Sequence, residues 1–348
     1  MLTQITEQLA QGVSLSAEQI EAAVQQLVDD RLAAECKADF LSALARKGET
    51  IEEIAGFASA LRERSTVPIL DPATRQREIL DVVGTGGDRL HTFNISTTVA
   101  ILVAAGWVTV AKHGNRAVTS KTGSADVLEA LGIRTNLSPI EAGAWLRDYR
   151  FAFFFAPGYH PAFKHIGPAR RLCAERGQRT LFNFLGPLLN PVRPTAQLIG
   201  VSQPALCEPM ARVLQSLGVR RGMIVCGQTE KGCIDELSTL GDTTVAEFYQ
   251  PLGLSTSTLS PRIFSLQRAT LADLTGGYRE ANALIVRHLL QGKDRGPRRD
   301  AVLLNAAAAL LIANQVRSLP EGWDQAARII DDGQAAAKLE ELVNASRL

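Results

Sequence analysis

Apolar residues recur at helical spacing through the first 65 residues of the chain. Ser16 and Gln19 form a capping-box pattern, and the helix that follows has one apolar face, made by Ile20, Ala23, Val24 and Leu27. A second helix is expected over about 35–47, where Gly48 ends it. Thr50 and Glu53 repeat the capping box before a third apolar face, made by Ile54, Phe57, Ala58 and Leu61. The pattern predicts a small all-helical unit.

The period changes near residue 79, where short apolar runs begin to alternate with helical stretches. The run ILDVV (79–83) ends in glycines and suits a buried strand. Further strand candidates are VTVAKH (108–113), FAFFFA (151–156), AQLIGV (196–201), GMIVCG (222–227) and TTVAEF (243–248). Helices are expected over 96–105, over 124–131 and from Arg299 onward. This alternation predicts βαβ units, and so an α/β fold with a mostly parallel central sheet.

The composition is that of a globular protein with ample apolar material. The chain has 348 residues, of which 46% are hydrophobic and 21% charged, so it suits two domains or one large α/β unit. The net charge of +1 provides no global field for nucleic acid or an anionic membrane. The longest apolar stretch, 301–313, contains Asn305 and is too short to span a bilayer. We expect no nucleic-acid partner and no membrane partner.

The cysteines and the N-terminal residues favour a cytoplasmic protein. No CxxC pair occurs among the five cysteines, which makes a zinc site improbable and favours reduced thiols: Cys36, Cys173, Cys207, Cys226 and Cys233. The first residues, MLTQITEQLAQG, lack the basic and apolar regions of a secretory signal.

The most informative segment is GTGGD (84–88), directly after the first predicted strand. Three glycines in four positions allow a sharp turn that exposes backbone N–H groups, and such a nest suits phosphate oxyanions. A plain tight turn is an equally good interpretation of the segment alone. The dinucleotide fingerprint is excluded because Arg89 stands where it needs glycine, and GxxxxGK[ST] occurs nowhere.

Three later segments have compositions that suit anions. Asn94, Ser96 and Thr97 stand at a predicted helix start, where Ser96 or Thr97 would cap the helix or face a phosphate. KHGNR (112–116) ends a predicted strand and has the lysine and arginine of an anion site, although a solvated loop would look similar. SKTGSAD (120–126) could form a lid over a ligand.

Adjacent carboxylates at Asp235 and Glu236 are the candidate metal ligands, although a solvated acidic turn would look the same. The metal-site interpretation of this pair is favoured because a polyphosphate site needs Mg²⁺ and the sequence has no other obvious acidic cluster. The chain has five histidines, which are His91, His113, His160, His165 and His288. The spacing of these residues indicates no Ser/His/Asp or Cys/His catalytic set, so the sequence gives no support for covalent catalysis.

Together these segments resemble the anthranilate phosphoribosyltransferase family. The ordered matches are DVVGTGGD (81–88), TFNIST (92–97), KHGNRAVTSKTGSADVLEALG (112–132), FAPGYHPAFKH (155–165), RTLFNFLGPLLNP (179–191), IDELS (234–238) and RDAVLLNAAAAL (299–310). The resemblance implies a nucleoside-phosphorylase-like phosphoribosyltransferase with an N-terminal helical domain over 1–75, completed by a helical segment near 165–190, and an α/β domain over 76–348. It implies a homodimer that pairs through the helical domain.

The resemblance also implies the reaction. The phosphoribosyl group of 5-phosphoribosyl 1-pyrophosphate (PRPP) passes to the amine of anthranilate, with Mg²⁺ as cofactor, in the second step of tryptophan biosynthesis. The family's donor-binding positions correspond to Gly84, Thr85, Gly86, Gly87, Asp88, Asn94, Ser96, Thr97, Lys112 and Ser124. Its anthranilate contacts correspond to Gly84, Asn115, His160 and Arg170, and its metal ligands to Ser96, Asp235 and Glu236. No residue is expected to act as a covalent catalyst.

The chain departs from the family pattern at two places. GQTEKGCI (227–234) is longer than the usual stretch, which bears on the placement of Asp235 and Glu236. Thr119 and Thr122 stand where serines are more usual, which keeps the hydroxyls. Three alternatives remain: another arylamine acceptor, a pyrimidine nucleoside phosphorylase, which KHGNR and LFNFLGPLLNP disfavour, and a non-catalytic relative that binds nucleic acid, which the net charge disfavours.

Overall fold

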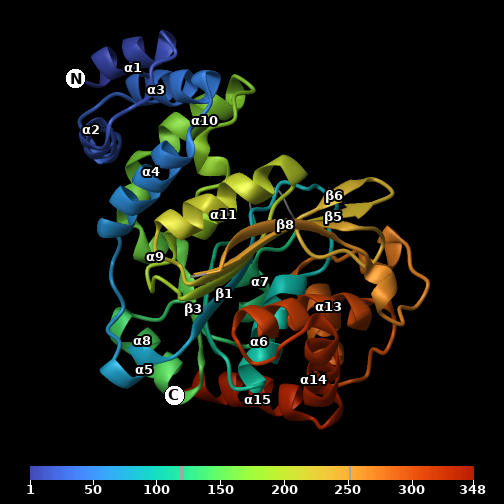
Figure 1. The fold of residues 1–348 in the computed structure, drawn as a ribbon. Helices are drawn as coiled ribbons and strands as arrows, with labels where there is room; N and C mark the ends of the chain where they lie inside the picture. The colour runs from blue at the N-terminus through green and yellow to red at the C-terminus, as the bar shows by residue number, and fades with distance from the viewer. Residues whose placement is uncertain (118–120, 251) are drawn as a thin grey trace.

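A computed structural model describes residues 1–117, 121–250 and 252–348, and it has a helical part and a larger α/β part (Figure 1). The helical part starts with α1 (Leu2–Ala10), α2 (Ala17–Val28), α3 (Ala34–Lys47) and α4 (Ile51–Glu63). Both predicted capping boxes are present, because Ser16 and Thr50 accept from the backbone of Gln19 and Glu53. The predicted helices are confirmed, with boundaries within about one residue.

A later segment packs against these four helices. The helix α10 (Gly167–Glu175) lies against α3. Lys37, buried in α3, donates from Nζ to the His165 carbonyl at 2.9 Å. One apolar cluster contains residues from α1 to α4 and from α10. The helical part is therefore built from two separate stretches of the chain.

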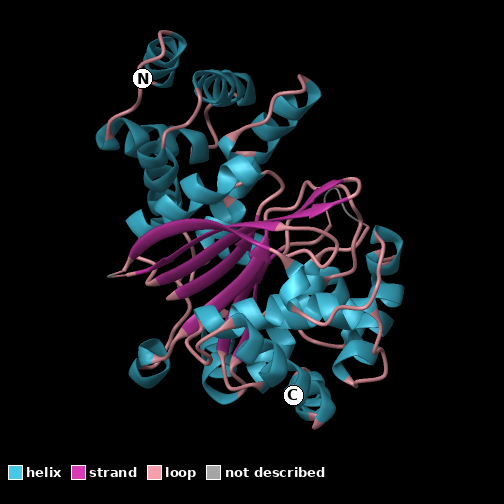
Figure 2. Ribbon diagram, turned by 45° about the vertical axis from the view of Figure 1, so that its right-hand side comes forward, coloured by secondary structure: helices cyan, strands magenta, loops and turns pink. Residues whose placement is uncertain are grey.

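The α/β part is organised around one sheet (Figure 2). Its strands are β1 (Ile79–Gly84), β2 (Thr109–Gly114), β3 (Phe151–Phe155), β4 (Ala196–Gly200), β5 (Arg221–Thr229), β6 (Gly232–Ile234), β7 (Thr243–Tyr249) and β8 (Gly253–Leu259). The order is β3-β2-β1-β4-β5-β7-β8, with β6 paired to β5. The first five strands of this order are parallel, and β6, β7 and β8 join antiparallel. The mostly parallel sheet is confirmed, with an antiparallel edge.

Helices cover both faces of this sheet. The described helices outside the helical part are α5 (Pro72–Gln76), α6 (Ile95–Ala105), α7 (Ser124–Leu131), α8 (Pro139–Asp148), α9 (Ala156–Tyr159), α11 (Cys207–Ser216), α12 (Arg279–Leu290), α13 (Pro297–Ile312), α14 (Leu319–Asp331) and α15 (Gln334–Ala345). α11 lies on the side of the helical part, and α6 and α13 on the other side. The apolar stretch near Asn305 is the buried helix α13, as predicted. Among the described residues, no helix has the length and hydropathy needed to cross a bilayer.

Alternate residues of the central strands belong to two different cores. Leu198 in β4 and Met223 in β5 pack in the cluster with α6 and α13. Their neighbours Ile199 and Ile224 pack in the cluster that also contains the helical part. Successive side chains of a strand point to opposite faces, so the sheet separates the two clusters. The helical part thus shares its core with one face of the sheet.

Candidate active site

The glycine segment forms a loop where β1 ends, at the carboxyl edge of the parallel strands. Gly86 and Gly87 have φ of +73° and +87°, a region that favours glycine. Thr85 donates its backbone N–H to the Gly200 carbonyl at 2.9 Å, which joins the start of the loop to the end of β4. The helix α6 begins at Ile95, one residue before its predicted start, so the loop lies between a strand and a helix as the sequence indicated.

Asp235 and Glu236 lie beside the glycine loop, although the two segments are far apart in the sequence. Asp235 Oδ2 accepts from the Gly86 N–H at 2.7 Å, and Glu236 Oε1 accepts from the Ser96 N–H at 3.2 Å. Both carboxylates therefore point to the same corner. The extra length before the pair forms the hairpin of β5 and β6, in which Thr229 pairs with Gly232. The longer stretch bulges away as a hairpin and leaves the pair beside the glycine loop.

Two glycines allow this close approach. A Cβ at Gly84 would lie 2.3 Å from Oδ2 of Asp235, and a Cβ at Gly200 would lie 1.6 Å from the Asp235 carbonyl oxygen. Neither glycine has a positive φ, so the requirement is for space. The sequence predicted a role for Gly84 but missed Gly200. The available signal was a glycine inside a predicted strand, which marks a close approach of another backbone.

The electrostatics of this corner suit a divalent cation. Burial and the neighbouring Asp88 raise the pKa of Asp235, and burial together with Asp235 raises the pKa of Glu236 well above its usual range. Such shifts mean that the charged carboxylates lack compensation, which a bound cation would supply. No group of three or more His, Cys, Asp or Glu residues in the described ranges forms a metal site. The two carboxylates thus suit Mg²⁺ whose remaining ligands are hydroxyl, water or substrate oxygens.

The start of α6 rules out one of the two interpretations of the sequence, in which Ser96 or Thr97 caps the helix. The N-cap residue is Asn94, and its side chain makes no capping hydrogen bond. Asn94 Oδ1 instead accepts from Asn282 Nδ2 at 2.8 Å. The carboxylate of Glu236 takes the capping role at the Ser96 N–H. The Ser96 and Thr97 side chains are therefore not used as caps.

Lys112 connects β2 to this corner. Its ammonium is buried and donates to the Val82 carbonyl at 2.6 Å and to Ser96 Oγ at 3.2 Å. Burial lowers the pKa of Lys112, while Asp81 and Glu236 favour its charged form. A buried ammonium beside the glycine loop and the α6 N-terminus suits an anionic ligand.

The carboxylate of Asp126 joins the end of the KHGNR loop to the start of α7 by hydrogen bonds. Oδ2 of Asp126 accepts from the N–H groups of Ala117 and Gly123, both at 2.9 Å. Ser124 Oγ donates to the Asn115 carbonyl at 3.3 Å, so these two predicted site residues are neighbours. Of the predicted lid, Ser120 lies outside the described residues, as does Thr119, whereas Thr122 donates to the Gly277 carbonyl at 2.8 Å.

The arginine of this loop does not serve as a free cation. Arg116 forms ion pairs with Glu129 at 2.7 Å and with Asp126 at 3.2 Å, and its guanidinium lies over the Phe155 ring. Its charge is neutralised by α7. Of the two basic residues that suggested an anion site, only Lys112 faces the corner.

Two of the four predicted acceptor residues, His160 and Arg170, lie at the ends of a series of ring contacts. The ring centroids of His160 and Phe163 are 5.3 Å apart, and those of Phe163 and Phe182 are 5.7 Å apart. The guanidinium of Arg170, on the exposed side of α10, lies 5.5 Å from the Phe182 ring centroid. An aromatic wall therefore connects His160 with Arg170. It would suit a flat aromatic ligand with an anionic end.

A buried polar network beneath this wall was missed by sequence reasoning. Nε2 of His160 lies 3.2 Å from Nε2 of His113, and both rings are buried. Burial lowers the pKa of His113 to about 3 and that of His160 to about 4. His113 also donates its backbone N–H to Asp81, which accepts from Asn190 Nδ2 at 2.9 Å. The sequence feature that could have revealed this network is Asp81, a charged residue inside an apolar strand. Burial raises the pKa of Asp81 to about 6.

The two parts of the fold match the two domains of a glycosyl transferase family. Residues 3–65 match the helical bundle domain of the glycosyl transferase family, and residues 76–336 match its a/b domain. The anthranilate phosphoribosyltransferase of Lacticaseibacillus casei (strain BL23) is 45% identical over 343 residues, which are 99% of this chain and 97% of that protein. The chain therefore belongs to the anthranilate phosphoribosyltransferase family, as its motifs predicted.

Solved structures agree with this family. The crystal structure of anthranilate phosphoribosyltransferase from Thermus thermophilus matches with a TM-score of 0.89 at 40% identity, over 99% of both chains. The Saccharomyces cerevisiae enzyme in complex with PRPP and Mg matches with a TM-score of 0.87 at 28% identity, over 99% of this chain and 98% of that one. The yeast enzyme has also been solved with 4-fluoroanthranilate, with a TM-score of 0.85, 28% identity and the same coverage.

Proposed function

We propose that this protein transfers the phosphoribosyl group of PRPP to the amine of anthranilate, giving N-(5-phosphoribosyl)anthranilate and pyrophosphate. The reaction is the second step of tryptophan biosynthesis. The observation that carries the proposal is the convergence of Asp235 and Glu236 on the glycine loop and the α6 N-terminus, in a chain of this family. The test is consumption of anthranilate fluorescence by purified protein with PRPP and Mg²⁺. Turnover with another arylamine but not with anthranilate would refute the acceptor.

The donor side consists of groups that suit phosphates. The loop at 84–88 offers the pyrophosphate those backbone N–H groups that do not already donate to Gly200 or Asp235, and Lys112 offers a buried ammonium. Asn94, Ser96 and Thr97 contact the donor from the start of α6, and Ser124 contacts it from the start of α7. Oγ1 of Thr97 supports this assignment, because it is buried and has no hydrogen-bond partner among the described residues.

Mg²⁺ is the proposed cofactor, held by Asp235, Glu236 and Ser96 together with oxygens of the donor. When bound, it neutralises charge on the departing pyrophosphate. The protein's own contribution is to fix the two carboxylates through the N–H groups of Gly86 and Ser96, at 2.7 and 3.2 Å. Lys112 adds positive charge from the other side of the corner.

The acceptor side uses Gly84, Asn115, His160 and Arg170. The planar fork of Arg170 suits the anthranilate carboxylate. His160 has a lowered pKa, so its ring is neutral at pH 7 and can meet an uncharged aryl amine. That amine already carries a free electron pair at pH 7, so the reaction needs no strong base. Catalysis then rests on positioning and electrostatics.

Quaternary structure, location and domain limits are also proposals. We propose a homodimer that pairs through the helical domain, acting in the cytoplasm, with domains 1–75 and 76–348 and the first completed near 165–190. Packing of α10 on α3 supports that completion. Light scattering on the purified protein tests the dimer: a monomer at micromolar concentration would refute it.

A further inference from the structure

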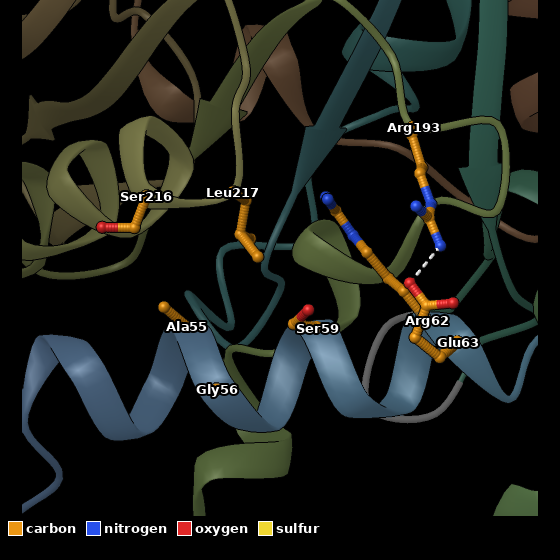
Figure 3. Close-up of a pocket in the computed structure, with 8 residues that line it drawn as sticks. All are labelled: Ala55, Gly56, Ser59, Arg62, Glu63, Arg193, Ser216 and Leu217. Atoms are coloured by element: carbon orange, nitrogen blue, oxygen red, sulfur yellow. Dashed lines mark hydrogen bonds and ion pairs between the residues drawn. The ribbon is translucent and has the colours of Figure 1, made fainter. Parts of the chain in front are cut away.

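A pocket of about 330 Å³ lies between α4, the end of α11 and the loop before β4 (Figure 3). The loop residue Arg193 precedes the amino end of β4, whereas the glycine loop follows the carboxyl end of β1. Because β1 and β4 are parallel, the pocket opens at the opposite edge of the sheet from the candidate active site. No residue assigned above to donor, acceptor or metal lines it.

Arg62 brings an unpaired charge to this pocket. The residue is 4% exposed, and its Nε donates to the Leu188 carbonyl. Within the described chain, Nη2 of Arg62 has no hydrogen-bond partner, and no ion pair includes this residue. Burial and the nearby charge of Arg193 lower the pKa of Arg62 to about 10, while the more distant carboxylate of Asp81 favours its charged form. A buried guanidinium normally has a carboxylate within ion-pair distance, and among the described residues Arg62 has none.

The other charges of the pocket set the charge of its ligand. Arg193 is ion-paired with Glu63 at 2.5 Å, and both side chains are more than half exposed. Figure 3 shows Arg62 and Arg193 entering from α4 and from the loop, with Glu63 beside Arg193. Two arginines and one glutamate leave one net positive charge. The pocket therefore matches a ligand with one negative charge, whereas inorganic phosphate carries more than one at pH 7.

The other residues that line the pocket indicate the chemical class of the ligand. Ala55 and Leu217 provide apolar surface, and Ser59 provides a hydroxyl. Arginine forks match the planar geometry of a carboxylate and bind it through two hydrogen bonds. We propose that this pocket binds a small monocarboxylate with a short apolar body, with Arg62 as the main anchor. The proposal does not depend on which reaction the active site performs.

The test uses fluorine NMR of trifluoroacetate, a monocarboxylate with a short apolar body, added to the full-length protein. Mg²⁺ and pyrophosphate are present throughout, so that anion binding at the glycine loop is saturated. The expected result is saturable line broadening that propionate reverses at lower concentration than inorganic phosphate does. No saturable broadening, or stronger competition by phosphate, would overturn the proposal.

Three variants locate the binding. Arg193→Ala should weaken it about fivefold and Arg62→Met by more than about tenfold, as expected for lost charge-assisted hydrogen bonds. Glu63→Gln should tighten it about threefold, because it frees Arg193 and adds one net positive charge. The matched control is Arg220→Ala, which removes an exposed arginine paired with Glu78 at 3.2 Å and should change nothing.

The variants at Arg193 and Glu63 decide the proposal even if the Arg62 variant does not fold. If thermal melting shows that Arg62→Met does not fold, Arg193→Ala and Glu63→Gln still decide, because both side chains are exposed and their loss should leave the core intact. Unchanged affinity in both of these variants would show that trifluoroacetate binds elsewhere and would overturn the assignment.

Discussion

Gly200 gives the sharpest test of how the acidic pair is held. In the sheet it pairs with Gly84 on one side and Val225 on the other, and the Asp235 backbone lies directly over it. The perturbation is Gly200→Ala, which adds a single methyl group in a strand without changing charge. The added Cβ would lie 1.6 Å from the Asp235 carbonyl oxygen and 2.2 Å from its carbonyl carbon. Neither atom belongs to a flexible side chain, so the segment itself must move.

The size of the movement sets the expected loss. Ordinary van der Waals contact begins at 3.4 Å, so the Asp235 carbonyl must retreat by about 1.8 Å. A misplacement of about 1 Å in a catalytic site can lower the rate on the order of 100-fold. We therefore expect kcat/KM for PRPP to fall by about 100-fold, with the Mg²⁺ concentration for half-maximal rate rising, because the carboxylates of Asp235 and Glu236 are displaced together.

The assay is the anthranilate fluorescence assay over a matrix of PRPP and Mg²⁺ concentrations. Gly167→Ala is the control, because a Cβ there meets nothing within 4 Å and no positive φ is involved. It should retain wild-type kinetics. If Gly200→Ala folds, as judged by circular dichroism, and keeps kcat/KM within about threefold of wild type, then the close packing of Asp235 does not position the metal site.

Three further predictions concern the same site. Replacing Asp235 and Glu236 by alanine should abolish Mg²⁺-dependent use of PRPP in the turnover assay, as chelation of the metal should in the wild type; unchanged activity would place the metal elsewhere. Arg170→Ala should raise the KM of anthranilate about tenfold or more and leave that of PRPP unchanged, and a shift in the PRPP value alone would contradict the carboxylate role. His113 and His160 have folded-state pKa values near 3 and 4, below the usual 6.5, so the unfolded chain takes up protons first as the pH falls. Their contribution to stability is therefore complete above pH 6.5 and is lost on acidification towards pH 4, by at most about 2 to 3 kcal/mol per pH unit for two protons. Urea unfolding should show a flatter pH dependence in the double variant His113→Gln/His160→Gln, and equal slopes would refute this.

The strands that contain several apolar residues could be predicted from the sequence, and the strands that contain few could not. Each predicted strand appears with either end shifted by at most two residues, because a short stretch with three to six apolar residues, next to glycine or charged residues, leaves few alternatives. The strands β6 and β8 were missed. β8 reads GLSTSTL and is mostly exposed, so its sequence has no apolar face to reveal it. It exists because β7 offers it a partner edge, which is tertiary information.

The site was predictable as far as local composition decides it. The glycine loop, Lys112 and the acidic pair come together as predicted. The cap on α6 did not follow from the sequence, because the carboxylate that meets the Ser96 N–H belongs to Glu236, 140 residues further on. Arg116 looked like part of an anion site but pairs with Glu129 and Asp126, acids that the same stretch of sequence supplies. A local pattern shows which charges are present but not which of them neutralise one another.

The two-core arrangement of the sheet has a consequence for cooperativity. Residues of the helical part share one apolar cluster with Ile199, Ile224 and Phe248 of the sheet. Melting the helices alone would expose this face of the strands to water, at a free-energy cost that rises with the apolar area uncovered. The helical part and the sheet should therefore unfold in one transition. Residues 1–75 expressed alone would lack both α10 and the sheet face that complete their core, so we expect them not to fold on their own.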